Sequence, residues 1–144
     1  ERPYRADAAI DALFRECAAA HPGRVALEQG GERWTYAELD QWSDRAAGAL
    51  RAAGVEAGAV VGVAGERSPR LLAAFLAALK AGAAYLPLDP TYPAARLSAM
   101  TADAAPALMI VADGLDAGWL GDYAGPVLSL ADCEAGDARP VSSA

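Results

Sequence analysis

The sequence predicts an α/β fold in which an N-terminal β-hairpin and helices lead into a doubly wound, mainly parallel sheet. Short apolar runs without polar alternation recur along the chain, and such strands are covered on both faces, as in a parallel sheet. Segments with helical spacing separate these runs, and this order favours right-handed crossovers. A chain of 144 residues is long enough to bury one core, so we expect one domain.

The N-terminal part predicts a helix followed by a hairpin. Apolar residues at helical spacing indicate a helix over residues 8–20, and the sequence His-Pro-Gly at 21–23 ends it. Two extended segments, 25–29 and 32–36, flank a Gly-Gly pair at which a tight turn requires positive φ. This pattern is typical of a two-residue β-hairpin.

The next predicted helix has its own start and stop signals. Thr35 to Glu38 has the form T-x-x-E, in which the threonine side chain caps the helix and the glutamate bonds back to the threonine amide. An apolar stripe at helical spacing continues to Ala53, and Gly54 is placed to end the helix with positive φ. We therefore expect one long amphipathic helix after the hairpin.

Strands and helices alternate in the remainder of the chain. The apolar runs and periodic segments predict strands over 60–64, 84–88, 108–112 and 127–130, and helices over 71–80 and 93–102. Ser68 and Pro69 supply an N-cap and a first-turn proline, and Pro93 is placed for the same first-turn role. We expect a short helix around 116–120. Residues 1–134 form the predicted domain, and 135–144 form a linker or disordered tail.

Composition and charge exclude several classes of function. The chain has 12 Lys and Arg residues against 19 Asp and Glu residues, a net charge of -7, and no basic cluster, so nucleic acid is not an expected partner. Cys17 and Cys133 form no CxxC or metal-ligand cluster, and charged residues stand where a signal peptide needs an apolar run; we expect reduced thiols and a cytoplasmic location. The apolar tract 71–88 is shorter than the roughly 20 residues that span a bilayer, so we expect buried core and no membrane partner.

The residues themselves assign no catalytic, cofactor-binding or metal-ligating position. Ligands bind beyond the carboxyl ends of strands in open α/β sheets, so a site is sought after Ala64, Leu88 and Ala112. None of these loops has the form G-x-x-x-x-G-K-[ST], and no G-x-G-x-x-G follows a strand. We interpret Gly62 and Gly65 as sites of close strand packing.

Single polar residues have structural explanations. His21 lies in a turn with no Ser, Cys or carboxylate placed to work with it, so we interpret it as a turn residue. Asp89 is open to a ligand-facing role, but D-P-T-Y-P is a strong turn sequence, which we favour. Lys80 ends a helix, where the macrodipole favours a cation whose amine reaches water. Arg70 and Arg96 fit solvated helix flanks, with an Asp89–Arg96 pair as a further hypothesis.

Two segments resemble core motifs of the amino-acid adenylation domains of nonribosomal peptide synthetases, which belong to the AMP-forming acyl-adenylate synthetase superfamily. WTYAEL at 34–39 is similar to the first core motif, and LKAGAAYLPLDP at 79–90 is similar to the second. Residues 10–27 and 89–97 resemble the flanking segments of the same family, and four ordered matches make the resemblance highly specific. We interpret the motif positions as structural; they are Thr35, Tyr36, Glu38, Leu39, Leu79, Lys80, Gly82, Tyr85, Pro87, Asp89, Pro93 and Arg96.

The resemblance implies a partial large-subdomain core of the adenylate-forming fold. It implies that the phosphate loop, the substrate pocket, the ribose-binding aspartate and the catalytic lysine lie beyond Ala144, because adenylation domains are several times longer. The intact domain is expected to use ATP and Mg to form an aminoacyl-adenylate, and then to pass the acyl group to the phosphopantetheine thiol of a carrier protein. The implied partners are the remainder of the domain, the carrier protein and an upstream condensation domain.

We therefore expect the N-terminal part of an adenylation domain, without cofactors or catalytic activity of its own. The alternative is a noncatalytic α/β module that binds a partner. A third reading, a small Rossmann-like nucleotide-binding protein, is disfavoured by the missing phosphate loop. A part of a larger core should also leave an apolar patch exposed, larger than the few hundred Å² usual for a monomer.

Overall fold

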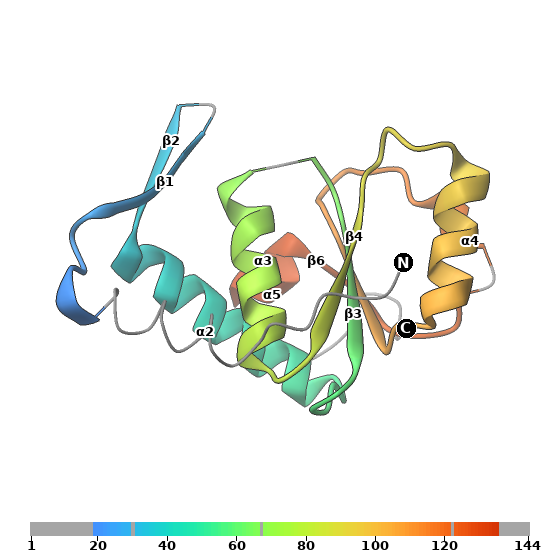
Figure 1. The fold of residues 1–144 in the computed structure, drawn as a ribbon, viewed down its shortest axis with the longest axis horizontal. Helices are drawn as coiled ribbons and strands as arrows, with labels where there is room; N and C mark the ends of the chain where they lie inside the picture. The colour runs from blue at the N-terminus through green and yellow to red at the C-terminus, as the bar shows by residue number, and fades with distance from the viewer. Residues whose placement is uncertain (1–18, 30, 67, 122, 136–144) are drawn as a thin grey trace.

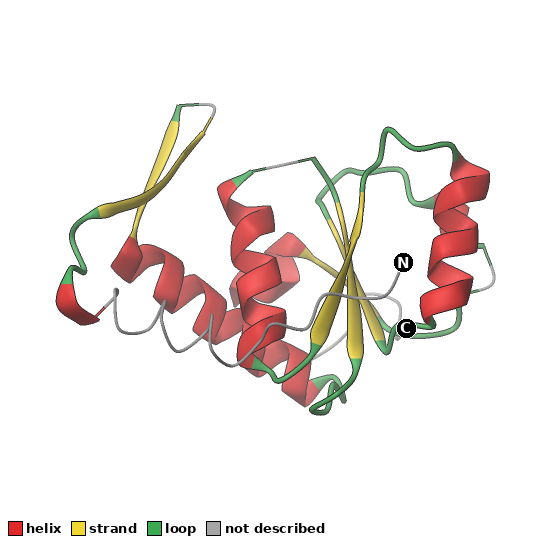
Figure 2. Cartoon of the chain, viewed as in Figure 1, coloured by secondary structure: helices red, strands yellow, loops and turns green. Residues whose placement is uncertain are grey.

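The computed structural model describes residues 19–29, 31–66, 68–121 and 123–135. It contains an antiparallel hairpin and a four-stranded parallel sheet with helices on both faces (Figure 1, Figure 2). Of the predicted helix over 8–20, only the last two residues are described, and both are helical. Cys17 and the predicted tail after Ala135 lie outside the described residues.

The hairpin forms where the sequence predicts it. Strand β1 (Val25–Gln29) pairs antiparallel with β2 (Glu32–Thr35), and Gln29 lies opposite Glu32, so the turn has two residues. The described turn residue, Gly31, has φ +85°, a conformation that costs little without a Cβ. The hairpin projects away from the sheet, beyond the start of the first long helix (Figure 1).

Helix α2 (Tyr36–Ala52) begins with the predicted capping box. The Glu38 amide donates to Thr35 Oγ1 at 3.1 Å, and the Thr35 amide donates to Glu38 Oε1 at 2.8 Å, so two amide groups without helical partners are satisfied. Gly54, with φ +105°, follows the end of the helix. Both helix signals are confirmed.

The central sheet is parallel throughout, with strand order β4-β3-β5-β6. Helix α3 links β3 to β4, and helix α4 links β4 to β5 across β3. The elements are β3 (Val60–Ala64), α3 (Pro69–Lys80), β4 (Ala84–Leu88), α4 (Ala94–Ala104), β5 (Leu108–Val111), η1 (Gly118–Leu120), β6 (Val127–Ser129) and α5 (Leu130–Ala135).

The two faces of the sheet bury separate apolar clusters. Helices α2, α3 and α5 cover one face, while α4 and η1 cover the other (Figure 1). The first cluster centres on side chains such as Leu50, Val61 and Ile110, and the second on Leu97 and Met109. Because helices lie on both faces of a parallel sheet, the doubly wound α/β fold is confirmed.

Three details differ from the sequence-based expectations. Strand β6 ends at Ser129, and the helix that follows it, α5, was not expected. Its signal is present in the sequence: the Asp132 amide donates to Ser129 Oγ and the Ser129 amide donates to the Asp132 carboxylate, which is the reciprocal capping of S-x-x-D. Pro93 occupies the N-cap of α4 rather than its first turn.

Lys80 joins helix α3 to helix α2. Its ammonium donates to Asp40 Oδ1 at 2.6 Å and to Asp44 Oδ1 at 2.8 Å, and the side chain is 0% exposed. Arg51 donates back to the Lys80 carbonyl at 2.8 Å. The prediction that the amine reaches water is wrong, because two carboxylates one turn apart on α2 cover it.

Most apolar side chains of the two clusters are buried. Val25, at 41%, is the one large hydrophobic side chain that is exposed within the described ranges, while others such as Phe75 and Leu79 are half-buried; the expected apolar patch stays a prediction. Alanine accounts for much of the contact between α2 and α3, and such small side chains let two helices approach closely. None of the described helices combines the length and the apolar character needed to cross a membrane.

Replacing Lys80→Met should lower the free energy of unfolding by about 2 kcal/mol, because Asp40 and Asp44 lose a charged donor but keep access to water. The double variant Asp40→Asn with Asp44→Asn should cost more, about 3 kcal/mol, since it leaves the ammonium buried without the two carboxylate charges that face it. Urea denaturation of each variant measures both values. Asp103→Asn, an exposed change on α4, is the control, and equal losses in the two Lys80-site variants would contradict the asymmetry.

Candidate functional site

The topology places a candidate site between the carboxyl ends of β3 and β5. After β3 the chain passes through α3, on one face, to β4 at one edge of the sheet. After β5 it passes through η1, on the opposite face, to β6 at the other edge. Neighbouring strands whose connections diverge in this way open a crevice, the usual ligand position in doubly wound sheets. Of the three loops expected after Ala64, Leu88 and Ala112, the first and third border this position, with β5 ending at Val111, whereas the loop after Leu88 follows β4 at the end of the described strand order.

Close packing fills the β3 side of this crevice. A Cβ added to Gly65 would lie 2.8 Å from Ala112 Cβ and 2.9 Å from Leu71 Cδ1, closer than such atoms approach in proteins. A Cβ at Gly62 would collide with the sulfur of Met109. The packing interpretation of both glycines is therefore confirmed.

Arg70 forms an ion network with two carboxylates that also occupies this position. Arg70 Nη2 lies 3.0 Å from Asp113 Oδ2 and 3.0 Å from Glu134 Oε1, and Arg70 Nε donates to Glu134 Oε2 at 3.1 Å. The assignment of Arg70 to a solvated helix flank is wrong, because this side chain bridges the loop after β5 and helix α5. The guanidinium faces two carboxylates, so it offers no unbalanced charge to a phosphate.

The pKa of Asp113 is lowered by its place in this network. Burial alone would raise the pKa of Asp113, but the Ala131 amide and the Arg70 guanidinium together outweigh burial and lower it. The Ala131 amide donates to Asp113 Oδ1 at 3.2 Å. The same carboxylate therefore binds both the arginine of α3 and the first turn of α5.

The residues of the first motif build the start of α2. Thr35 and Glu38 form the capping box, Tyr36 is the first helical residue, and Leu39 is buried in the core. Asp40, which follows this motif directly, binds Lys80 of the second motif. The structure therefore joins the two motifs through one ion pair, which the sequence alone did not show.

The other residues of the second motif also belong to the scaffold. Leu79 is half-buried, and Gly82 follows α3 with φ +82°. The Tyr85 ring lies 4.6 Å from the ring of Phe75, centroid to centroid. Pro87 is exposed on β4, at the end of the strand order in the described sheet, where a missing amide donor is tolerated.

Asp89 and Arg96 do not pair with each other. Asp89 Oδ1 accepts hydrogen bonds from the Thr91 amide at 2.9 Å and the Thr91 hydroxyl at 2.8 Å, and these bonds lower the pKa of Asp89. The Arg96 guanidinium lies 4.2 Å from the centre of the Tyr92 ring, a cation–π geometry. The turn interpretation of Asp89 is confirmed, and the pairing hypothesis is wrong.

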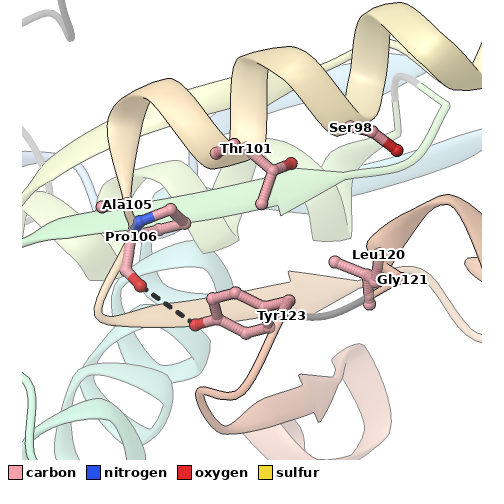
Figure 3. A pocket seen from close by; sticks show the side chains of 8 residues that line it. Ser98, Thr101, Ala105, Pro106, Leu120, Gly121 and Tyr123 are labelled. Carbon is pink, nitrogen blue, oxygen red and sulfur yellow. Dashed lines mark hydrogen bonds between the residues drawn. The ribbon is translucent and has the colours of Figure 1, made fainter.

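A cavity of about 540 Å³ lies between α4 and the segment that precedes β6 (Figure 3). Its polar groups are already bonded: the Tyr123 hydroxyl donates to the Pro106 carbonyl at 3.1 Å, and the Thr101 hydroxyl donates to the Leu97 carbonyl at 2.9 Å. Burial raises the pKa of Tyr123 to about 12, so this phenol stays protonated at neutral pH. No motif residue lines the cavity.

The remaining side chains that could react, His21 and Cys133, have structural roles. His21 is exposed in its turn, where the Arg24 amide donates to the His21 carbonyl at 3.1 Å. Burial, followed by the charge of Asp132, raises the pKa of Cys133 to about 12, so its thiol is a poor nucleophile. Within the described part of the chain, no three His, Cys, Asp or Glu residues are grouped to hold a metal ion.

Comparison with known proteins identifies the class to which this scaffold belongs. Residues 14–140 match the family described as AMP-binding enzyme. The structure superposes on VinN in complex with L-aspartate with a TM-score of 0.80 and 30% identity, over 88% of this chain and 33% of VinN. It also superposes on the N-terminal subdomain of Klebsiella oxytoca NpsA with a TM-score of 0.77 and 27% identity, over 88% of this chain and 32% of NpsA.

The similar sequences belong to large peptide synthases. A linear gramicidin synthase of Brevibacillus parabrevis is 43% identical over 82% of this chain and 2% of the synthase polypeptide. A plipastatin synthase of Bacillus subtilis is 48% identical over 75% of this chain and 4% of the synthase polypeptide. The fold and the matched range define an α/β scaffold of adenylate-forming enzymes. The chain belongs to the AMP-binding enzyme family and corresponds to an N-terminal portion of an adenylation domain of nonribosomal peptide synthetases.

Asp113→Asn should reduce stability at neutral pH, and the difference from the unchanged chain should shrink as the pH falls. In the folded state the pKa of Asp113 lies below its usual 3.8. The stability that this carboxylate adds to the fold is therefore fully present above pH 3.8, and it is lost as the pH falls through the folded-state pKa. Thermal unfolding measured across this acidic range checks the sign. A difference that grows on acidification would contradict the assignment.

Cys133 should resist thiol reagents while the chain is folded. With Cys17→Ser present, Cys133 is the only remaining thiol, and its burial and raised pKa leave little thiolate at mildly alkaline pH. Reaction with a disulfide reagent such as Ellman's reagent should be slow for the native chain and complete after unfolding in urea. Fast labelling before unfolding would show that the thiol is not held in the core between α5 and the rest of the chain.

Proposed function

We propose that this chain is the N-terminal scaffold of an amino-acid-activating adenylation domain that works in nonribosomal peptide biosynthesis. The proposed reaction of the whole domain is ATP-dependent formation of an aminoacyl-adenylate, followed by acyl transfer to a carrier-protein thiol. In this proposal residues 1–134 belong to the adenylation-domain core, and residues 135–144 are a linker or tail. The chain has no catalytic activity by itself.

One observation carries the proposal of a scaffold role. The crevice in which a doubly wound sheet usually holds its ligand is filled by Gly65 packing and by Arg70 paired with two carboxylates. The motif residues support the same view, because their described contacts form caps, turns and the joint between α2 and α3. These contacts stabilise the fold and leave no polar group among them directed at a ligand.

The ATP and Mg expected for the intact domain do not fit the described residues at the carboxyl ends of β3 and β5. Phosphate binding requires a cradle of free backbone amides or unpaired cations, whereas Arg70 is neutralised by Asp113 and Glu134. We therefore derive no chemical step from this chain. The proposed partners are the remainder of the domain, a carrier protein with phosphopantetheine and an upstream condensation domain; the cytoplasmic location and the absence of nucleic-acid binding stay predictions.

One observation favours the alternative of a partner-binding module without catalysis. Val25 is the one described large hydrophobic side chain that is exposed, while others such as Phe75 and Leu79 are half-buried. A scaffold that covers its own core can fold alone. The two readings differ in whether the chain restores activity when it meets the rest of an adenylation domain.

The test is amino-acid-dependent ATP/pyrophosphate exchange after mixing. This chain should show no exchange alone, and should restore exchange when added to the remainder of the homologous domain of the plipastatin synthase, which begins where the match to this chain ends. The rate should rise with the amount of complex, because the added scaffold positions a site that the remainder carries.

Matched variants separate folding from function in this test. Lys80→Met should lower exchange in proportion to the loss of folded complex, whereas the exposed change Asp103→Asn should leave it unchanged. A folded complex of the two parts without exchange would overturn the scaffold role and favour the noncatalytic module.

A further inference from the structure

The cavity of about 540 Å³ between α4 and the segment before β6 has the size and character of a small-molecule site. Such sites are hollows of roughly 300–1,000 Å³ with mainly apolar walls and a few placed polar groups. Apolar walls are supplied here by Ala102, Ala105, Pro106 and Leu120, and none of the lining residues that the structure describes is charged. The cavity lies on the face of the sheet that α4 and η1 cover (Figure 1) and shares no residue with the crevice or the motifs. A site here is therefore separate from the scaffold role.

The hydroxyl groups of the wall have already donated their protons. Ser98 donates to the Trp119 carbonyl, and Tyr123 donates to the Pro106 carbonyl at 3.1 Å (Figure 3). The buried Thr101 hydroxyl donates to a helix carbonyl at 2.9 Å. A hydroxyl oxygen that has donated its one proton still carries lone pairs. Because Ser98 is exposed and Tyr123 is half-buried, their oxygens remain as acceptors for a ligand.

The backbone amides of the wall are committed as well. Four of them donate to carbonyls three or four residues earlier, those of Ala105, Leu120, Gly121 and Tyr123. Pro106 has no N–H to offer, and the other described lining residues lie inside α4, where the amides bond within the helix. Over its described wall, the cavity therefore presents acceptors and apolar surface but no free donor.

The Tyr123 side chain is held in place as part of this wall. A Cβ added to Gly125 would collide with the Tyr123 hydroxyl, so glycine at this position lets the phenol approach the backbone. Burial raises the pKa of Tyr123 to about 12, so the hydroxyl keeps its proton, and its bond to Pro106, at neutral pH. The wall is thus preorganised for a ligand that donates a hydrogen bond.

We propose that this cavity binds a small uncharged molecule with an apolar body and a hydroxyl donor, such as a simple phenol. The apolar body packs against Pro106 and Leu120, and the O–H donates to the hydroxyl oxygen of Ser98 or Tyr123. An anion finds no donor in the described wall, and a cation finds no opposite charge there, so either would be desolvated without compensation. A polypeptide segment fits less well, because its backbone carbonyls would also lack donors.

Three small molecules of similar size test this chemistry by NMR titration of the chain. 4-Ethylphenol should shift the amide signals of lining residues such as Ala105 and Gly121 to saturation, with a dissociation constant of about 1 mM, as expected for so small a ligand. Its isomer 4-methylanisole has a methyl ether in place of the O–H, and it should bind about fivefold more weakly because one hydrogen bond is lost. 4-Methylbenzylamine, a cation at neutral pH, should also bind more weakly than 4-ethylphenol.

Two variants on α4 locate the site. Ala102→Leu places a larger side chain at the cavity wall and should abolish the binding of 4-ethylphenol. Ala99→Leu makes the same change at another exposed position of the helix, outside the described lining, and should leave binding unchanged. Circular dichroism and urea denaturation check that both variants are folded.

Each contrary result overturns one part of the proposal. Binding of 4-methylanisole as tight as that of 4-ethylphenol would overturn the requirement for a donor, and tighter binding of 4-methylbenzylamine would overturn the preference for an uncharged ligand. A titration of 4-ethylphenol without saturation, or unchanged binding to the Ala102→Leu chain, would overturn the site. These outcomes are independent of ATP/pyrophosphate exchange, by which the scaffold role is tested.

Discussion

The arrangement of the helical layer depends on the buried ammonium of Lys80. A charge removed from water is tolerated only when it is paired and hydrogen-bonded, and Lys80 meets this condition through Asp40 and Asp44. The pairing fixes the end of α3 against the middle of α2, and Arg51 adds a bond in the reverse direction. Since α3 leads directly into β4, the same contact also sets where the second strand of the sheet begins.

Small residues determine how closely the layers pack around this joint. Alanines fill much of the boundary between α2 and α3, and glycines at 62 and 65 let β3 approach its neighbours. Close approach buries the centres of both apolar clusters, while Val25 is exposed and side chains such as Phe75 and Leu79 stay half-buried. The chain therefore has a packed core of its own, although it matches only about a third of VinN.

Polar groups are hydrogen-bonded to different degrees at the sheet crevice and at the hairpin. At the carboxyl ends of β3 and β5, Arg70 and its two carboxylates satisfy one another and fasten α5 to the sheet. At the hairpin, by contrast, the buried indole N–H of Trp42 has no hydrogen-bond partner. A satisfied network stabilises one conformation, whereas an unsatisfied donor lowers stability until an acceptor binds. The sheet crevice is therefore the better satisfied of the two places, and the buried Trp42 indole is a cost to stability at the hairpin junction.

The sequence by itself determined the elements, because caps, turns and apolar periodicity act within a few residues. The T-x-x-E box, Ser68 at the start of α3 and the turn at Asp89 all formed as predicted, and a similar local signal at Ser129 caps α5. Only the tertiary structure decided the ion pairs. Lys80 meets carboxylates 36 and 40 residues away, and Arg70 meets carboxylates 43 and 64 residues away; no local pattern encodes such partners, because they meet only after the sheet has set the distance between the helices.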